Sequence, residues 1–276
     1  MAEPVASGRT AGAGARDFLE RVGRRAAGGV EEFGVAGWLL GQSLFFLVLG
    51  RARRQPVRLP RVIAEMMQIG IAALPITTLL SVTIGLMLAL QGIHTLETFG
   101  AESQIVIGVA FAVTREFAPL ITGILVAGRS GSALAARIAT MTINQEVDAL
   151  RVMGVDPVRF LVVPSLVAAL VMVPALTLWS AIVSQLAAGA WVQLDLGIGL
   201  PVYVHQTFEV LGTEDLLHGM TKSVIFAVLI VLIAVVNGAS VRGGAEGVGR
   251  RTTRTVVHCI SAILITDMIF VWITTR

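Results

Sequence analysis

The sequence has few of the residues from which soluble proteins build their surfaces. Only 14% of its 276 residues are charged, whereas soluble domains carry about 25% charged residues. Lysine occurs once, at Lys222, so the basic charge rests almost entirely on arginine. Cysteine also occurs once, at Cys259, which excludes an intrachain disulfide and a cysteine-based metal site. Low charge together with 55% hydrophobic residues predicts a membrane protein.

Motifs for chemistry are missing as well. The four histidines are scattered without the spacing of a metal site, and no GxxxxGK[ST] nucleotide-binding loop occurs. The arginines fall between apolar runs and do not gather on one soluble face, which argues against nucleic acid as a partner. We therefore expect no catalytic residue, no metal, no cofactor and no nucleic acid.

What the sequence does have is long apolar segments. Five of them are long enough to cross a hydrocarbon core of about 30 Å: residues 66–93, 103–128, 160–194, 223–241 and 255–275. Arginines precede the first segment and recur in the second and fourth loops, whereas residues 95–102 and 195–221 contain no lysine or arginine. By the positive-inside rule this alternation predicts an all-α membrane protein with five spans, a cytoplasmic N-terminus and a periplasmic C-terminus.

The N-terminal region is predicted to lie at the membrane surface. Residues 1–15 are rich in Gly and Ala and are expected to be disordered, while residues 16–33 place Phe18, Val22, Ala26, Val30 and Phe33 on one helical face, an interfacial pattern. Residues 34–50 are apolar but short, with arginines on both sides. We expect residues 16–62 to form amphipathic and half-inserted helices before a five-span domain at 63–276; a sixth crossing is the alternative.

The loop between the second and third spans carries the most information. Its first half, residues 128–139, consists almost entirely of Gly, Ala and Ser, which lets helix backbones pack closely. Its second half, residues 144–154, reads as a short amphipathic helix at the membrane surface. The expected boundary signals are a capping box of Thr142 and Gln145, a stop at Gly154, and Asp156 capping the next helix with Pro157 in its first position.

Four stretches in this order carry a family resemblance: TREFAPLITGILVAGRSGSALAARIATM, QEVDALRVMGVDP, TKSVIFAVLIVLIAVVNG, and GVGRRTTRTVVH followed by Asp267. They resemble the MlaE/YrbE permease family from about residue 81 to the C-terminus. The resemblance implies a homodimeric inner-membrane subunit of an ABC transporter that moves phospholipids or related lipids, and that is not itself an enzyme. It implies as partners a cytoplasmic ATPase, an MCE-domain lipid-binding protein outside the membrane and a small STAS-domain accessory subunit.

The resemblance also assigns residues. Residues 144–154 would be the coupling helix that docks on the ATPase, through Gln145, Glu146, Val147, Asp148, Leu150, Arg151 and Met153. The sequence departs from the family where the usual Glu-Gln pair appears as Gln145-Glu146, and where Arg137 and Arg151 occupy positions that are often acidic in relatives. Such charge reversals at a docking surface would require a compensating change in the partner.

A lipid cavity is the second implied site, with Leu88, Thr95, Leu96 and Phe99 at the outer end of the first span. Arg115 and Glu116 lie near the middle of the second span, where charges are costly and usually face a cavity or a partner. Arg115 would either meet a lipid phosphate or form a structural ion pair with a neighbouring helix. Packing or lipid contact is the alternative for the four outer residues, and Asp267 is read as a polar anchor.

Two other classes of protein remain as alternatives. An ion-coupled secondary transporter would be expected to show inverted repeats and several intramembrane carboxylates, but only Glu116 and Asp267 are evident. A membrane-embedded lipid-modifying enzyme would need a nucleophile with its base, or a metal site, on the spans. Neither alternative accounts for the surface helix at 144–154.

Overall fold

The computed structural model describes residues 34–46 and 59–274, and within these ranges every regular element is a helix. Five helical segments are long and apolar enough to cross a membrane: Leu59–Glu97, Glu102–Ile143, Val158–Leu196, Thr213–Ala239 and Gly244–Thr274. The predicted all-α fold with five spans is confirmed, and each span begins or ends beyond its apolar run. The expectations for residues 1–33, and for the part of the N-terminal region at 47–58, lie outside the described residues.

The apolar helix ahead of the first span is short. It covers Gly34–Phe46, and 13 residues at 1.5 Å each give a length of about 20 Å. That length is below the hydrocarbon thickness of about 30 Å. The described part of this helix is thus too short to cross by itself, and the half-inserted helix stays a prediction, with a sixth crossing as its alternative.

Several spans are composed of more than one helical element. The first consists of α2 (Leu59–Ile69), η1 (Ile71–Ala73) and α3 (Leu74–Glu97). The second consists of η2 (Glu102–Gln104), α4 (Ile105–Phe111), η3 (Ala112–Phe117), α5 (Ala118–Val126), η4 (Ala127–Gly131) and α6 (Ser132–Ile143). After α7 (Glu146–Val152), the third span consists of η5 (Val158–Val162) and α8 (Val163–Leu196), and it is followed by α9 (Leu200–Val210), α10 (Thr213–Ala239) and α11 (Gly244–Thr274).

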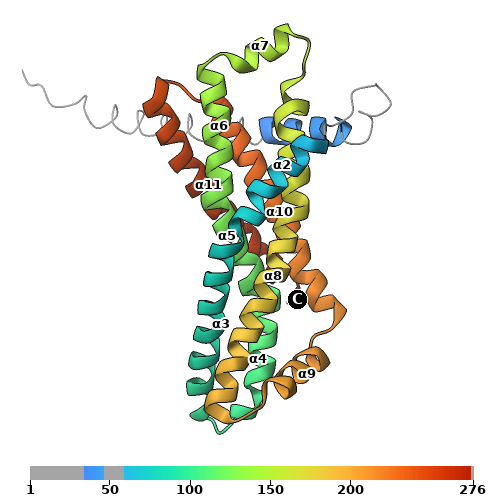
Figure 1. The fold of residues 1–276 in the computed structure, drawn as a ribbon, viewed down its shortest axis with the longest axis vertical. Coiled ribbons are helices and arrows are strands. Elements are labelled where there is room, and N and C mark those ends of the chain that lie inside the picture. Colours follow the sequence, from blue (N-terminus) through green and yellow to red (C-terminus); the bar gives the residue numbers. More distant parts are fainter. Residues whose placement is uncertain (1–33, 47–58, 275–276) are drawn as a thin grey trace, which may run out of the picture.

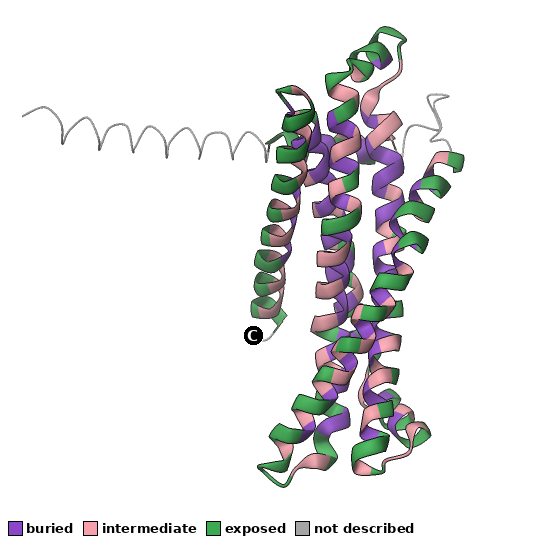
Figure 2. Cartoon of the chain, turned by 60° about the vertical axis from the view of Figure 1, so that its left-hand side comes forward, coloured by how far each residue is buried: buried purple, intermediate pink, exposed green. Residues whose placement is uncertain are grey.

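The elements form an elongated bundle with two different ends (Figure 1). The short helix α7 projects at one end, whereas the α3–α4 turn and α9 lie at the other. The helix α8 is central, since it packs against α2, α3, α5, α9 and α10. The side of α11 that faces away from the bundle is exposed along its length (Figure 2), and it carries apolar residues such as Ile265, Met268 and Trp272. In a membrane, lipid or a second subunit would cover this face.

Small residues allow the first and third spans to pack closely. A Cβ atom on Gly85 would lie 2.1 Å from the backbone oxygen of Ser184. The Ser184 hydroxyl donates a hydrogen bond to the backbone oxygen of Ser81 at 2.9 Å, and the Ser81 hydroxyl donates to that of Ser180 at 2.8 Å. Helix backbones approach this closely in membranes when the interface consists of small residues.

The small-residue segment 128–139 also packs as predicted. It continues the second span through η4 into α6, and α6 lies against α10 and α11. A Cβ atom on Gly131 would lie 3.0 Å from Cγ2 of Ile230, and one on Gly238 would lie 2.8 Å from the backbone oxygen of Ala135. Close helix packing therefore accounts for this part of the sequence.

Candidate functional site

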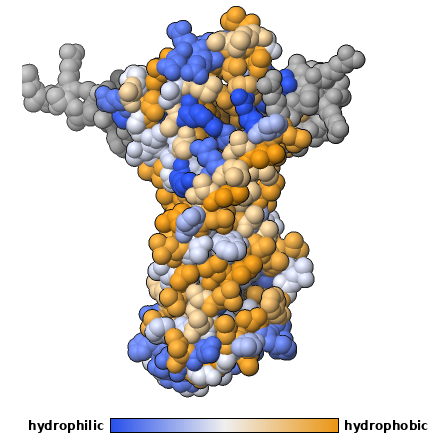
Figure 3. Space-filling model, viewed as in Figure 1, coloured by the Kyte–Doolittle hydropathy of each residue, from blue (hydrophilic) through white to orange (hydrophobic). Residues whose placement is uncertain are grey.

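The end of the bundle that carries α7 is rich in arginine. Arginines from several of its elements belong to it: Arg61 of α2, Arg137 of α6, Arg151 of α7, Arg159 of η5, Arg242 between α10 and α11, and Arg250, Arg251 and Arg254 in the first turns of α11. Hydrophilic residues gather there, around and below α7, in the space-filling view (Figure 3). We call it the arginine-rich end, and the opposite end, with α9 and the α3–α4 turn, the α9 end.

The surface helix predicted at residues 144–154 exists as α7, over Glu146–Val152, but the predicted capping box at its start is wrong. The Thr142 hydroxyl donates instead to the backbone oxygen of Ile138 at 2.8 Å, and Gln145 makes no capping hydrogen bond through its side chain. Gln145 has a φ of 57°, so the chain turns sharply between α6 and α7. A capping box requires an extended backbone at the N-cap residue. The N-cap of α7 is Gln145, whose left-handed backbone does not meet this requirement.

The predicted signals at the other end of α7 are confirmed. Gly154 has a φ of 74°, and the N–H of Val155 donates to the backbone oxygen of Leu150 at 2.9 Å, as in a glycine-terminated helix. The carboxylate of Asp156 then accepts the backbone N–H of Val158 at 2.8 Å. These contacts fix α7 between two spans at the arginine-rich end.

The predicted coupling residues lie on different faces of α7. Leu150 is only 7% exposed, whereas Met153 is 67% exposed and its neighbour Val152 is 89% exposed. Gln145 and Glu146 are exposed as well. The exposed side chains of Asp148 and Arg151 form an ion pair of 3.0 Å with each other. Leu150 is thus buried within this chain, and an outward apolar surface is formed by Val152 and Met153.

The two arginines that depart from the family pattern have different surroundings. Arg151 is on the exposed part of α7, as the docking argument requires. Arg137 lies on α6 and forms an ion pair of 2.6 Å with the buried carboxylate of Glu65 on α2. The charge at position 137 is therefore compensated within the chain.

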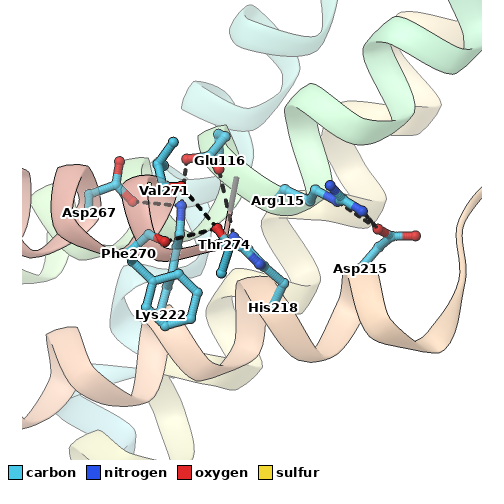
Figure 4. Close-up of polar contacts among 9 residues, drawn as sticks. All are labelled: Arg115, Glu116, Asp215, His218, Lys222, Asp267, Phe270, Val271 and Thr274. Atoms are coloured by element: carbon cyan, nitrogen blue, oxygen red, sulfur yellow. Dashed lines mark hydrogen bonds and ion pairs between the residues drawn. The ribbon is translucent and has the colours of Figure 1, made fainter. Parts of the chain in front are cut away.

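A cluster of charged side chains crosses the bundle at the level of Arg115 and Glu116, which belong to η3 (Figure 4). Lys222 of α10 is at its centre, with a side chain only 1% exposed. Its ammonium donates to Glu116 at 2.5 Å and lies 2.9 Å from the carboxylate of Asp267 on α11. One buried cation thus joins the second, fourth and fifth spans through two carboxylates.

His218 borders the same cluster. Its Nε2 atom lies 3.8 Å from Oε1 of Glu116, and its ring meets that of Phe270 edge to face, with 4.8 Å between the ring centroids. The imidazole thus lies between Lys222 and the pair formed by Arg115 and Asp215 (Figure 4).

Arg115 has a partner of its own, Asp215. Its Nε atom donates to the Asp215 carboxylate at 2.6 Å, and the other oxygen of that carboxylate accepts the backbone N–H of Gly212 at 2.7 Å. The Arg115 guanidinium lies 4.8 Å from the ring centroid of Phe111, and its side chain is 46% exposed. Arg115 is thus paired with a neighbouring helix and still has an open side.

The backbone brings η3 close to α10. A Cβ atom on Gly219 would lie 2.4 Å from the backbone oxygen of Thr114, so only glycine permits this approach.

The side chain of Gln185 on α8 links α4 to α9. Its amide donates to the backbone oxygen of Ala110 at 3.2 Å and accepts from the Tyr203 hydroxyl at 3.0 Å. The α9 end is thereby tied to the helix that leads into η3.

The four residues predicted for the outer part of a lipid cavity lie at the α9 end. Leu88 and Leu96 pack, partly buried, against the apolar cluster formed by α3, α4, α8 and α9. Thr95 and Phe99 are exposed, Phe99 to 79%. The structure does not bring them together with Arg115 and Glu116 in one contact network, and their part in a cavity stays a prediction.

Three members of the charge cluster were not predicted from the sequence. Asp215 and His218 stand in a stretch that reads as a loop but belong to the first turns of α10. Lys222 is the only lysine of the chain and directly precedes an apolar run, which was the signal available. Asp267 was read as an anchor without a partner in its own span, and its partner comes from another span.

Five apolar helices with a charge cluster inside them and a short helix between two spans define a multi-pass membrane protein. Residues 62–273 match the family described as Permease MlaE. The chain belongs to this family.

Curated relatives agree with this assignment. A probable ABC transporter permease protein of Rickettsia prowazekii is 34% identical over 234 residues, which is 83% of this chain and 90% of the relative. The intermembrane phospholipid transport system permease protein MlaE of Haemophilus influenzae is 32% identical over 92% of this chain and 95% of its own length. The chloroplast protein trigalactosyldiacylglycerol 1 of Arabidopsis thaliana is 33% identical over 72% of this chain and 57% of its own length.

Proposed function

We propose that the chain is the membrane subunit of an ABC transporter that moves phospholipids or related lipids between the inner membrane and an MCE-domain protein outside it. Membership of the MlaE permease family and the printed name of the Haemophilus relative support the lipid substrate. The arginine-rich end would face the cytoplasm by the positive-inside rule. Two copies would form the permease, and a STAS-domain subunit would accompany the ATPase.

The observation that carries this proposal is α7. It lies beyond the apolar part of the spans at the arginine-rich end (Figure 1) and exposes Val152 and Met153 to 89% and 67%. Exposed apolar side chains on a short, firmly fixed helix are typical of a protein interface. We expect the cytoplasmic ATPase to bind there, so that its movement on ATP hydrolysis reaches the spans through α6 and η5.

The substrate would meet the charge cluster on the open side of Arg115. Asp215 occupies the Nε edge of the Arg115 guanidinium and holds this side chain in one orientation, and the remaining N–H groups suit a phosphate group. Glu116, Lys222 and Asp267 would hold the three spans around it. Leu88, Leu96 and Phe99, together with Thr95, would contact acyl chains towards the α9 end.

Reconstitution tests the proposal. The chain, its candidate ATPase and its candidate MCE protein are placed in liposomes with a fluorescent phospholipid, and ATP-dependent transfer to or from the MCE protein is measured. Transfer that needs all three proteins and ATP supports the function. Transfer driven by an ion gradient instead of ATP would show that the chain is a secondary transporter, and transfer that needs neither would contradict an ABC transporter.

A further inference from the structure

A large cavity lies at the arginine-rich end, on the membrane side of α7. It has a volume of about 820 Å³, is open on one side, and is lined by five elements: the helix Gly34–Phe46, α6, α7, η5 and α10. The helix Gly34–Phe46 is the blue helix near that end in Figure 1. Cavities of this size, mostly apolar with a few polar groups, are typical of sites for small ligands. None of the residues that line this cavity belongs to the charge cluster around Lys222.

The inner walls of the cavity are apolar. They include Ile138 of α6, Val158 and Val162 of η5, and Val235 of α10, all of which are almost fully buried. Because these residues belong to membrane spans, the cavity extends from the surface into the level of the apolar bundle. A hydrocarbon chain suits such walls better than a polar solute does.

Polar groups line the rest of the cavity. Arg151 contributes a side chain that is 67% exposed and pairs with Asp148 through Nη1 at 3.0 Å. Its other N–H groups remain for a phosphate at the edge of the cavity. Thr142 lines the cavity as well. Gln42 also lines it, and its side-chain oxygen is buried without a hydrogen-bond partner. A buried acceptor without a partner is open to a donor from a ligand, and the ammonium of an ethanolamine headgroup is such a donor.

We propose that this cavity binds a phospholipid of the adjacent leaflet, with its acyl chain between the spans and its headgroup between Arg151 and Gln42. Two charged residues line the cavity, Arg151 and Asp156. The Asp156 carboxylate accepts the backbone N–H groups of Val158 and Arg159, which leaves Arg151 as the group for a phosphate, and a basic side chain at the cytoplasmic end of membrane helices is a known type of contact for lipid headgroups. The site would be separate from the path of the transported lipid. It would join the helix Gly34–Phe46 to α7, so that occupancy stiffens the surface on which the ATPase is proposed to dock.

A lipid fits this cavity better than a segment of the ATPase does. Val152, the last residue of α7, and Met153, which follows it, are strongly exposed but do not line the cavity. The residues of α7 that line it are Val147 and Arg151. A protein that docks on Val152 and Met153 would therefore lie on the other side of the helix. Trp38, which lines the cavity and is 59% exposed, is of the residue type that gathers at membrane surfaces. The proposed lipid site requires that the spans lie in a membrane, and it does not depend on which lipid is transported. Its effect on α7 rests on the proposed docking of the ATPase.

Photolabelling of the full chain without partners tests the site. The chain is reconstituted in liposomes of phosphatidylethanolamine and phosphatidylglycerol that contain a phosphatidylethanolamine with a diazirine in its acyl chain. After illumination, the labelled peptides are identified by mass spectrometry. We expect label within residues 138–162 and 235–240, and its absence from both stretches would overturn the proposal.

Two variants locate the lipid. Ala239 lines the cavity and is exposed at the end of α10, so Ala239→Phe should fill the space without disturbing the core. It should lower labelling of the two stretches about tenfold, which corresponds to about 1.4 kcal/mol. Ala245→Phe, at an exposed alanine near the start of α11, is the matched control and should leave the labelling unchanged. Equal labelling of Ala239→Phe and the original chain would refute the site.

The headgroup contact has its own variant and its own control. Arg151→Gln should lower the labelling several-fold, whereas Arg250→Gln, at another exposed arginine of the same end, should not. Addition of the ATPase tests whether the ATPase, and not a lipid, occupies the cavity. If the ATPase displaces the label from residues 138–162 and 235–240, the cavity is a protein docking site and the proposal is wrong; if the label stays, the lipid and the ATPase occupy different sides of α7.

Discussion

Lys222 and Asp267 form an ion pair of 2.9 Å between the fourth and fifth spans. The lysine is the only one in the chain and is 1% exposed, and a second carboxylate, that of Glu116, contacts the same ammonium. A buried ion pair costs much of its Coulomb energy in desolvation, but removal of one partner leaves an uncompensated charge. The three spans therefore depend on Lys222 more than on either carboxylate alone.

Substitution of Lys222 by Met should destabilise the chain strongly. Two carboxylates would then face each other without a cation, and loss of one partner of a buried pair costs about 3–5 kcal/mol. The measurement is the midpoint of thermal unfolding in detergent, followed by size-exclusion chromatography. The triple change K222M, E116Q and D267N removes all three charges and should restore most of the midpoint. A single K222M variant as stable as the original chain would contradict the role of this cluster.

The ion pair of Arg115 with Asp215 leads to a second prediction, on substrate contact. Arg115→Ala alone leaves Asp215 without its cation, so any loss of transport could reflect lost stability. The double change R115A and D215N removes both charges and should recover the folded protein in size-exclusion chromatography. If Arg115 meets the lipid phosphate, this double variant should still carry less bound phospholipid and transport about tenfold less, which is about 1.4 kcal/mol of lost interaction. Full transport by the double variant would show that Arg115 is structural.

The arrangement of this cluster explains which parts of the site the sequence could predict. Arg115 and Glu116 stand out because they interrupt an apolar run, and the charge alternation between loops predicts five spans. Asp215 does not stand out, because it follows Glu214 in a polar stretch where the start of α10 cannot be recognised. The pairing of Asp267 with Lys222 depends on how two spans cross, and a single sequence contains no information on that distance.

The surface helix shows the same division at a smaller scale. Gly154 and Asp156 take part in hydrogen bonds with residues a few positions away in the chain, so their roles follow from the local sequence. Leu150 has the spacing of an outward apolar face, but tertiary packing buries it. The turn at Gln145 is likewise imposed by the junction of α6 and α7, and this overrides the capping box that the spacing of Thr142 and Gln145 predicts.

Substitutions at Val152 and Leu150 distinguish an effect on ATPase binding from an effect on the stability of the chain. Val152→Asp changes a side chain that is 89% exposed, so the chain should fold normally but retain less ATPase in co-purification. Leu150→Ala should instead lower the unfolding midpoint, because loss of a buried leucine costs about 2–5 kcal/mol. Val152→Ala is the matched control, as it shortens the same side chain without adding charge. Normal ATPase retention by Val152→Asp would remove α7 from the proposed interface.

The membrane orientation can be tested with single cysteines. Cys259 is buried and is first replaced by Ser, so that each new thiol is the only one. Cysteines at Glu97 and Thr213, both exposed at the α9 end, should react with a membrane-impermeant maleimide added to intact cells. A cysteine at Asn144, exposed beside α7, should react only after the cells are opened. Labelling of Asn144→Cys in intact cells would reverse the proposed orientation.

Close packing of the first and third spans gives the last prediction. Gly85→Ala would place a methyl group 2.1 Å from the backbone oxygen of Ser184, and a backbone atom cannot rotate away as a flexible side chain can. The two helices must separate, which also stretches the hydrogen bond from the Ser184 hydroxyl to Ser81. Overpacking of this kind costs about 1–3 kcal/mol, visible as a lower unfolding midpoint. Gly108→Ala is the matched control on α4, since no atom lies within 4 Å of its added Cβ, and it should leave the midpoint unchanged or slightly raised. If both variants unfold alike, the separation of α3 and α8 is set by something other than Gly85.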